Sequence, residues 1–214
     1  MTERGKYIVI EGTEGAGKGT QCEIIANWLA GMGQRCRVVR EPGGDPFGEA
    51  LRLVLKDPDL HHEADEELLT FVAARMGMRR RVVLPALEAG EWVIADRSEA
   101  STFVYQGIVG GTDLDEIRLL HEKYVDPICR PDLFIVITLP YDESERRVDG
   151  RGEARDFFES QGEQYLRMIA NGYMDACRIM REMGYTTHEI YGLQSIERVS
   201  LAIKTLLEEN VLTS

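Results

Sequence analysis

The chain has 214 residues, of which 43% are hydrophobic, enough for one sizeable core, and we expect a single domain over residues 1–214. Its formal net charge of -12 argues against binding to a nucleic-acid polymer, which depends on neutralisation of phosphates by Lys and Arg, but is compatible with a small phosphorylated ligand in a local positive pocket. No apolar run has the length of a signal-peptide core or of a membrane-spanning helix, and the four cysteines form no Cys-x-x-Cys pair. We therefore expect reduced thiols, no membrane association and a cytoplasmic location.

The first predicted elements are a strand over residues 7–10 and a helix over residues 22–30, joined by a glycine-rich turn that ends in Lys18. Glycines allow backbone conformations that residues with a Cβ avoid, so the turn can direct several N–H groups at an anion at the start of the helix. The lysine ammonium can then bridge the outer phosphates of a nucleoside triphosphate. The spacing Gly-x-x-x-x-Gly-Lys therefore predicts a phosphate-binding loop, which consists of Gly12, Thr13, Glu14, Gly15, Ala16, Gly17, Lys18, Gly19 and Thr20.

Two details of this loop bear on its ligand. The order Gly-x-x-Gly-x-Gly differs from the Gly-x-Gly-x-x-Gly of dinucleotide-binding turns. The hydroxyl residue expected directly after the lysine is replaced by Gly19, and Thr20 follows one step later. A Mg²⁺ ion would therefore be held through water, phosphate oxygens or another residue. The alternative interpretation is a strand-to-helix turn that carries a solvated lysine.

Four more short apolar runs follow, separated by longer amphipathic stretches, at residues 37–39, 92–95, 133–138 and 185–191. Strands that alternate with helices predict a parallel sheet covered by helices on both faces, which is an α/β fold of three layers with five strands. Ligands of such sheets bind beyond the carboxyl ends of the strands. The residues directly after each run are therefore the candidates for a functional site.

Candidate ligand-binding residues follow the second run. Arg40 opens a loop that contains a proline and two glycines, and it would lie either at the rim of the phosphate-loop crevice or in solvent as an ordinary surface arginine. A helical pattern over residues 64–89 places Phe71 and Arg75 on one face, because they are four residues apart. The ring could stack on a nucleobase and the guanidinium could donate to its carbonyl edge. A core phenylalanine beside a surface arginine is the alternative.

The third run ends in Asp96 and Arg97. In a chain that has a phosphate loop, an aspartate at the end of a parallel strand predicts a carboxylate that faces Mg²⁺ or its waters, and the arginine could clamp a second phosphate. Ser101, Thr102 and Tyr105 lie on the helix that follows, where their hydroxyls could bond a base or a sugar. The alternative is an aspartate at a helix N-terminus followed by a surface arginine.

The remaining stretches predict helices and a lid. Thr112 is expected to cap a helix from Asp113 to about Tyr124, whose apolar stripe could face the core or the partner in a homodimer. Four arginines within ten residues, interrupted by two glycines, predict a basic lid at about 147–156, because a transferring phosphoryl group needs its charge neutralised with water excluded. A solvated charged loop is the alternative. A helix over about 157–183 and a last helix capped by Ser195 complete the chain.

Several of these stretches together resemble the thymidylate kinases, a family of P-loop nucleoside monophosphate kinases, over nearly the whole chain. The matching stretches are Tyr7 to Lys18, Arg40-Glu41-Pro42-Gly43-Gly44, Phe71-Val72-Ala73-Ala74-Arg75, Asp96-Arg97 with Ser101 to Gly107, and Arg130-Pro131-Asp132-Leu133. The resemblance to the bacterial type implies a P-loop kinase fold, ATP as the phosphoryl donor, dTMP as the acceptor and Mg²⁺ as cofactor. It also implies a homodimer.

The resemblance further implies roles for single residues. Lys18 and the glycine turn would hold the ATP phosphates, and Glu14 would approach the sugar 3′-hydroxyl and the metal region. On the acceptor side the implied residues are Phe71, stacked on thymine; Arg75, Thr102 and Ser101, bonded to the pyrimidine; Arg97 and Arg40, on the monophosphate; and Tyr105, near the 2′ position. Because Glu14 makes the loop acidic, the catalytic arginine would come from the lid, with Arg151 ahead of Arg147 and Arg155.

We therefore predict phosphoryl transfer from ATP to dTMP, with Lys18, Arg97, Arg151 and Glu14 as catalytic residues and Asp96 near the metal. A kinase for a 5-substituted dUMP or another nucleoside monophosphate is the first alternative. The second is a P-loop nucleotide-binding protein with weak or no transferase activity, which the glycine after the lysine and a short lid would favour.

Overall fold

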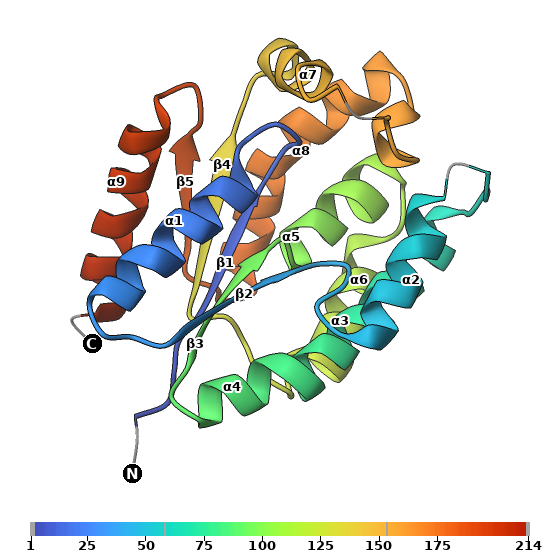
Figure 1. Cartoon of the computed structure of the whole chain (residues 1–214). Helices are drawn as coiled ribbons and strands as arrows, with labels where there is room; N and C mark the ends of the chain where they lie inside the picture. Colours follow the sequence, from blue (N-terminus) through green and yellow to red (C-terminus); the bar gives the residue numbers. More distant parts are fainter. Residues whose placement is uncertain (1–2, 58, 153, 213–214) are drawn as a thin grey trace.

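The computed structural model describes residues 3–57, 59–152 and 154–212. Its centre is a sheet of five parallel strands in the order β2-β3-β1-β4-β5 (Figure 1). The strands are β1 (Tyr7–Gly12), β2 (Cys36–Arg40), β3 (Trp92–Asp96), β4 (Leu133–Thr138) and β5 (Thr187–Tyr191). The predicted parallel sheet is confirmed, and each predicted apolar run overlaps one of these strands.

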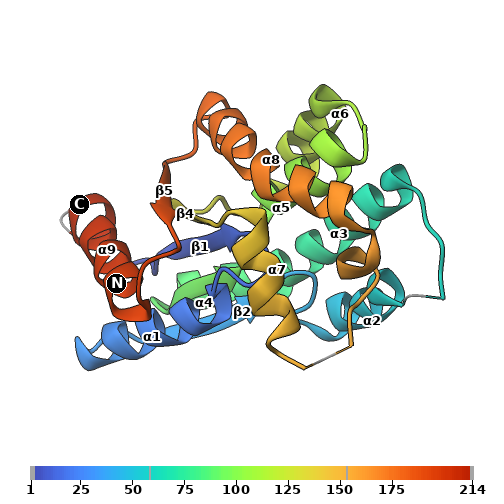
Figure 2. The same cartoon turned by 90° about the horizontal axis from the view of Figure 1, so that it is seen from above.

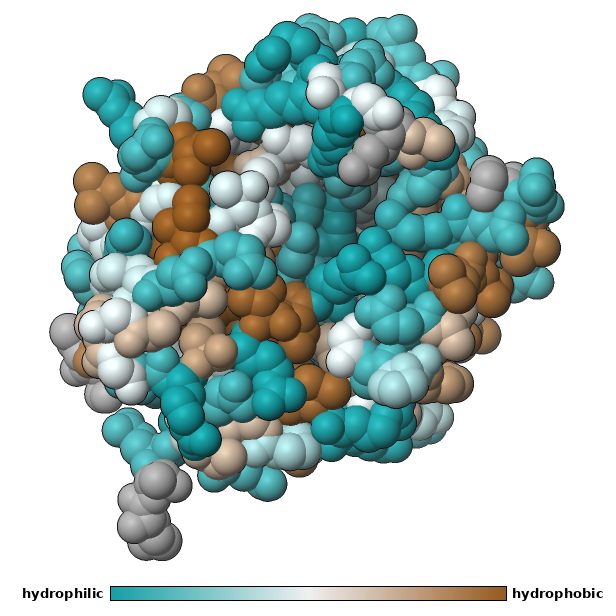
Figure 3. Space-filling model, in the orientation of Figure 1, coloured by the Kyte–Doolittle hydropathy of each residue, from teal (hydrophilic) through white to brown (hydrophobic). Residues whose placement is uncertain are grey.

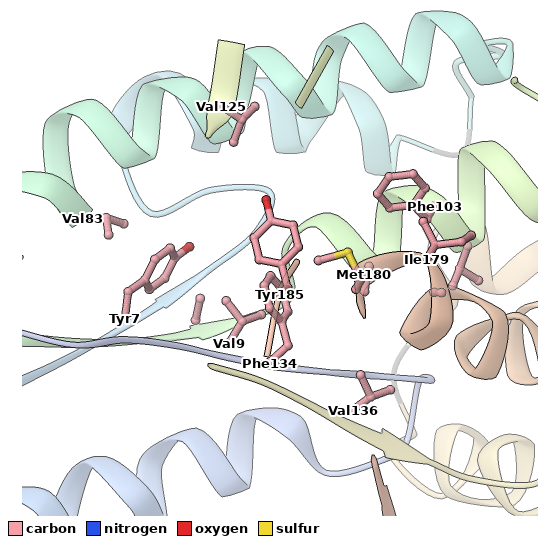
Figure 4. Close-up of a cluster of buried hydrophobic side chains, with 14 of the residues drawn as sticks. Tyr7, Val9, Val83, Phe103, Val125, Phe134, Val136, Ile179, Met180 and Tyr185 are labelled. Carbon is pink, nitrogen blue, oxygen red and sulfur yellow. The ribbon is translucent and has the colours of Figure 1, made fainter. Parts of the chain in front are cut away.

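Both faces of the sheet are buried, which explains why its strands read as continuous apolar runs. In β1 the side chains alternate between two cores: Tyr7 and Val9 belong to one, Ile8 and Ile10 to the other. Figure 4 shows the first core, where Tyr7 and Val9 lie near Phe134 and Tyr185. The rings of Phe134 and Tyr185 meet edge to face with centroids 5.1 Å apart, a favourable aromatic geometry.

Helices form the two outer layers (Figures 1 and 2). One layer contains α1 (Lys18–Gly31) and α9 (Ile196–Leu207), which continues into η5 (Glu208–Leu212). The other layer contains α3 (Ala64–Met78), η1 (Arg79–Val83), α4 (Leu84–Glu88), α5 (Glu99–Thr102), η2 (Phe103–Val109), α6 (Leu114–Leu120), η3 (His121–Val125) and α8 (Glu163–Glu182). Two further helices cover this layer: α2 (Pro46–Lys56) packs on α3, and α7 (Tyr141–Asp149) packs on α8. The predicted three-layer arrangement is thus confirmed.

The helix over residues 64–89 was predicted as one element, and it continues through α3, η1 and α4. In contrast, α2 and α7 were not predicted, although the start of α2 carries a local signal. The side chain of Asp45 accepts a hydrogen bond from the backbone N–H of Gly48 at 3.0 Å, and Pro46 occupies the first helical position.

Two predicted helix starts are wrong. Asp113, and not Thr112, caps α6, because its side chain accepts from the backbone N–H of Asp115 at 2.8 Å. The last long helix begins at Glu163 and not near Phe157, since Gly162 has φ +88° and interrupts the helix after the short 3₁₀ turn η4 (Phe158–Ser160). The predicted cap of α9 is confirmed: the Ser195 hydroxyl accepts from the backbone N–H of Arg198.

The four cysteines are unpaired thiols, as predicted, and three of them are buried. Among the described residues, no helix combines the length and the apolar character needed to cross a membrane.

Candidate active site

A cavity of about 600 Å³ lies beyond the carboxyl ends of β1 and β3, between the phosphate loop, the α2–α3 segment and the lid. In Figure 3 hydrophilic side chains surround a hollow on this face of the molecule. Of the predicted site residues, the cavity wall contains Glu14, Gly15, Gly17, Lys18, Gly19, Thr20, Arg40, Phe71, Arg75, Asp96, Arg97, Ser101, Thr102, Tyr105 and Arg151. The fold therefore brings together side chains that lie up to 137 residues apart in the sequence, from Glu14 to Arg151.

The phosphate loop has the backbone that the glycine pattern predicts. Gly12 and Gly15 have φ values of +140° and +72°, where a side chain is strained. A Cβ on Gly12 would also lie 2.1 Å from the Ile137 carbonyl oxygen. The Lys18 ammonium folds back over the loop and donates to the Thr13 carbonyl at 2.8 Å. Burial and the nearby Arg97 lower the pKa of Lys18.

Glu14 lies in the cavity wall between two arginines. One of its carboxylate oxygens pairs with Arg97, and the other lies 3.6 Å from Arg151. Burial alone would raise the pKa of Glu14, but the charges of Arg97, Lys18 and Arg151 outweigh it and hold that pKa well below its usual range. Glu14 is thus ionised and in contact with the cations that a phosphate group would approach.

Arg97 is held by its backbone conformation and by several hydrogen bonds of its side chain. Its φ of +77° is unusual for a residue with a Cβ and directs the side chain back across the end of β1. Its guanidinium donates to the Gly12 carbonyl at 3.2 Å, to the Ser101 hydroxyl at 3.0 Å and to the Tyr173 hydroxyl at 2.6 Å. The guanidinium is therefore held in place before any ligand arrives.

Asp96 and Gly19 lie side by side at the end of β3. A Cβ on Gly19 would lie 3.4 Å from Asp96 Oδ2, an ordinary contact, so space alone does not demand glycine there. The other oxygen, Asp96 Oδ1, is buried and receives no hydrogen bond from the described residues. Such an orphaned carboxylate oxygen is chemically suited to a divalent cation or to its waters.

The opposite end of the cavity is aromatic. Phe71 on α3, Tyr105 on η2 and Phe158 at the start of η4 all line it, and the Phe158 ring centroid lies 6.1 Å from that of Phe71 and 5.7 Å from that of Tyr105. The Arg97 guanidinium lies 5.6 Å from the Tyr105 ring centroid, within reach of a cation–π contact. A planar ligand can therefore be enclosed by aromatic faces here.

Arg75 is buried in the cavity wall and not exposed as a surface arginine would be. It donates through Nε to Glu41 at 2.5 Å, through Nη1 to His121 at 2.6 Å and through Nη2 to the Thr102 hydroxyl at 3.1 Å. These contacts occupy three of its five N–H donors. Sequence reasoning found Arg75 and Thr102 but missed Glu41 and His121, which lie 34 and 46 residues from Arg75.

His121 accepts from Arg75 because its other ring nitrogen, Nδ1, donates to the Ile117 carbonyl at 2.8 Å. Burial and the Arg75 charge lower the pKa of His121 from 6.5 to about 3. The unfolded chain therefore binds a proton more tightly than the folded chain between these values, and stability is lost as the pH falls from about 6.5 toward 3.

Between pH 7 and pH 5 we expect the free energy of unfolding to fall by roughly 2 kcal/mol more in the wild type than in His121→Gln, which keeps a neutral acceptor. Urea unfolding at both pH values measures this difference. The control is His61→Gln, whose histidine side chain is 84% exposed, and it should retain the wild-type pH dependence. Equal pH dependence of wild type and His121→Gln would contradict the buried neutral imidazole.

Two further sets of buried contacts, made by Glu11 and by Arg79, lie next to the cavity wall. Glu11, fully buried, accepts from the backbone N–H groups of Ser98 and Ser101 and from the Ser101 hydroxyl at 2.7 Å. The Ser101 hydroxyl, implied above to bond the pyrimidine, therefore already has a partner inside the protein. Arg79 pairs with Glu99, and both side chains are completely buried. Neither contact has a local signal in the sequence.

Three lid arginines differ in where they point. Arg147 donates to the carbonyls of Gly15 and Gly192 at 3.2 Å each, and Arg151 lies in the cavity near Glu14. Arg155 pairs with Glu145 and Asp149 outside the cavity. Of the three, Arg151 is thus the one with a guanidinium next to Glu14.

The cavity also contains cations that sequence reasoning missed. Arg52 and Lys56, both on α2, line it, and Lys56 pairs with Asp156 of the lid. Arg40 lies at the rim and pairs with Glu49 at 3.2 Å, with its side chain 57% exposed. Arg52 and Lys56 are four residues apart, so a helix that begins after Asp45 places both on one face. The Asp45 cap is thus the signal that could have found them.

A phosphate loop, a fixed arginine cluster and an aromatic pocket that share one cavity define a P-loop kinase for a small phosphorylated acceptor. A family model described as thymidylate kinase matches residues 10–203. The chain belongs to the thymidylate kinase family.

Individual relatives agree with the family match. The thymidylate kinase of Prochlorococcus marinus is 38% identical over 213 residues, which covers 96% of this chain and 95% of that protein. The thymidylate kinase of Dichelobacter nodosus is 38% identical over 170 residues, 79% of this chain and 83% of that protein. The crystal structure of thymidylate kinase from Ehrlichia chaffeensis has a TM-score of 0.72 at 25% identity and covers 95% of this chain and 99% of its own.

Proposed function

We propose that this protein transfers the terminal phosphoryl group of ATP to dTMP, giving ADP and dTDP. The bond between the terminal phosphorus and the oxygen that bridges it to the second phosphate breaks, and a dTMP phosphate oxygen forms the new bond. The observation that carries the proposal is the single cavity in which Lys18, Arg97 and Phe71 all lie. Because the acceptor phosphate is largely ionised near neutral pH, catalysis needs alignment and charge neutralisation more than a general base.

On the donor side, the phosphate loop holds the ATP phosphates. Backbone N–H groups at the start of α1 face the anion, and Lys18 exchanges its internal bond to the Thr13 carbonyl for a phosphate oxygen. Arg151 enters from the lid and offsets the charge that develops on the transferred group. Glu14 keeps Arg97 and Arg151 close to each other until the substrates bind.

On the acceptor side, Arg97 grips the dTMP phosphate, with Arg40 and Arg52 at the rim of the same cavity. Phe71 stacks on the thymine ring. Arg75 donates to a base carbonyl through the two N–H groups that its internal contacts leave available, and Thr102 lies beside it. Tyr105 lies near the sugar and disfavours a 2′-hydroxyl.

We also propose Mg²⁺ as the cofactor. The described residues contain no cluster of three or more His, Cys, Asp or Glu side chains that could hold a metal by themselves. A magnesium ion bound mainly by phosphate oxygens and water needs one or two carboxylates, and the orphaned oxygen of Asp96 fits that requirement. When bound, the ion would neutralise charge on the ATP phosphates.

The test is phosphorylation of a monophosphate by ATP in the presence of Mg²⁺, followed as ADP release and as the diphosphate of the added nucleotide, and compared over dTMP, dUMP, a further 5-substituted dUMP, dCMP and AMP. We expect the highest kcat/KM with dTMP. A higher kcat/KM for a 5-substituted dUMP or for AMP would favour the corresponding kinase instead. Tight binding of ATP and dTMP without product would point to a nucleotide-binding protein that lacks transferase activity.

The lid provides a prediction of its own. We expect Arg151→Ala to lower kcat about 100-fold, because a cation aimed at the transferring phosphoryl group is lost. Initial rates at saturating ATP and dTMP measure the effect. The control is Arg146→Ala, whose arginine is 71% exposed and pairs with Glu143, and its kcat should stay close to that of the wild type. Equal kcat values for the two variants would exclude Arg151 from catalysis.

We also propose that the protein is a homodimer and is located in the cytoplasm. Exposed leucines on α3 and α6, Leu69 and Leu119, are compatible with a contact between two copies of the chain. Sedimentation velocity of the purified protein measures the oligomeric state.

A further inference from the structure

The side-chain amide of Gln106 lies at the aromatic end of the cavity and is hydrogen-bonded to Glu67, which lies outside the cavity. Gln106 lies on η2, is 1% exposed, and lines the cavity with Phe71 and Arg75. Its Nε2 donates to Glu67 Oε2 at 2.7 Å. No hydrogen bond from the described residues reaches its amide oxygen, so that oxygen is available to a ligand.

Glu67 lies behind the cavity wall and does not face the ligand itself. It is 7% exposed, does not line the cavity, and uses its second oxygen, Oε1, in a 2.8 Å contact with His62 Nδ1. Burial raises the pKa of Glu67, whereas the hydrogen bonds from Gln106 and His62 act in the opposite direction. An ionised carboxylate accepts hydrogen bonds and donates none, so it selects the nitrogen side of the Gln106 amide. The amide oxygen must then point away from Glu67.

We propose that Glu67 is a positioning residue for base selection, which fixes the Gln106 amide with its oxygen toward the pyrimidine and thereby requires a hydrogen-bond donor at N3. This inference rests on the proposed function and deepens it. Arg75 presents donors on the same wall, so the pair offers one donor and one acceptor to the base edge.

The donor and acceptor order of this wall matches thymine and uracil but not cytosine. Thymine and uracil have a carbonyl at C4 next to an N3–H group, which suits a donor from Arg75 and an acceptor from Gln106. Cytosine has an amino group at C4 and an unprotonated N3. It would set donor against donor and acceptor against acceptor, and unpaired polar groups in a buried site are strongly disfavoured.

Glu67→Gln tests the role of the carboxylate. A glutamine at position 67 can either accept from or donate to the Gln106 amide, so both amide orientations become possible. We expect kcat/KM for dTMP to fall about 10-fold, mainly through KM, and the ratio of kcat/KM for dTMP over dCMP to fall about 30-fold. If Glu67 had a merely structural role, the substitution would lower kcat/KM for dTMP and for dCMP by the same factor and leave their ratio unchanged. That result would overturn the proposal.

The matched control is Glu66→Gln on the same helix. Glu66 is exposed, and its carboxylate accepts from the backbone N–H of Glu63 at 3.0 Å, a bond that glutamine can also accept. Its dTMP to dCMP ratio should equal that of the wild type.

A double variant shows whether Glu67 acts through Gln106. In a Gln106→Met background the amide is absent, so Glu67→Gln should change the dTMP to dCMP ratio no further. A persisting effect of Glu67→Gln in that background would also overturn the proposal.

A crystal structure of the wild-type protein with dTMP decides the question even if the variants fold poorly. We expect Gln106 Oε1 within hydrogen-bond distance of thymine N3 and Nε2 still on Glu67. An amide turned away from the base would contradict the inference.

The wild-type assay separates the two proposals. Absence of dTDP refutes the proposed function, whereas dTDP formation with an unchanged dTMP to dCMP ratio in Glu67→Gln refutes only the role of Glu67.

Discussion

Lys18→Met is expected to lower kcat about 1,000-fold, because the cation that neutralises the ATP phosphates in the transition state is removed. The methionine side chain has a similar length and no charge, and Lys18 is 6% exposed, so the apolar replacement fits the same space. The fold should survive, since the one internal hydrogen bond lost is that to the Thr13 carbonyl. Steady-state dTDP formation measures the activity, and thermal unfolding measures the stability.

The control for this variant is Lys123→Met, which removes an exposed lysine from η3, outside the cavity. Its kcat should be close to the wild-type value. Turnover by Lys18→Met at a comparable rate would remove this lysine from the mechanism and with it the main role assigned to the phosphate loop.

Arg79→Met should destabilise the protein by about 4 kcal/mol, the largest loss of stability that we expect from a single substitution. Arg79 and its partner Glu99 are completely buried, and the Arg79 charge holds the pKa of Glu99 at about 2 although burial acts to raise it. Without the arginine, Glu99 is a buried carboxylate that must either stay unpaired or take up a proton. Urea unfolding at pH 7 measures the loss.

Two further variants test this explanation. Arg178→Met removes an exposed arginine that pairs with Asp175 on the surface, and its effect should stay within about 0.5 kcal/mol. Arg79→Met combined with Glu99→Leu removes both charges and should recover part of the lost stability. A single Arg79→Met variant as stable as Arg178→Met would show that the buried pair contributes little.

The parallel sheet and the phosphate loop were predictable because their signals are local. A strand buried on both faces appears in the sequence as a run of apolar residues. Gly12, Gly15 and Gly17 of the loop lie where the backbone has positive φ. Gly12 also has no room for a Cβ, because it lies next to the Ile137 carbonyl. Helix ends were less predictable: Asp113 and Thr112 are both capping residues, and the sequence does not say which one the chain uses.

The burial of Arg75 beside Phe71 could not be predicted from neighbouring residues in the sequence. A four-residue spacing places both on one helix face, but it fits a surface arginine as well as a buried one. Burial of Arg75 is possible only because Glu41 follows β2 and His121 begins η3, and the fold brings both to the same guanidinium. Neither residue carries a sequence signal that points to Arg75.

By itself, the sequence determined the five strands and their order along the chain, the phosphate loop at Lys18, and the end of β3 at Asp96 and Arg97, since each depends on neighbours along the chain. The tertiary structure alone decided which buried polar and charged side chains pair: Glu11 with Ser101, Arg75 with Glu41 and His121, Arg79 with Glu99, and Gln106 with Glu67. Burial of a charge is costly unless a partner of opposite charge or a hydrogen-bond partner lies beside it, and these partners lie 20 to 90 residues away in sequence. Their pairing is therefore a property of the packed layers and not of any single segment.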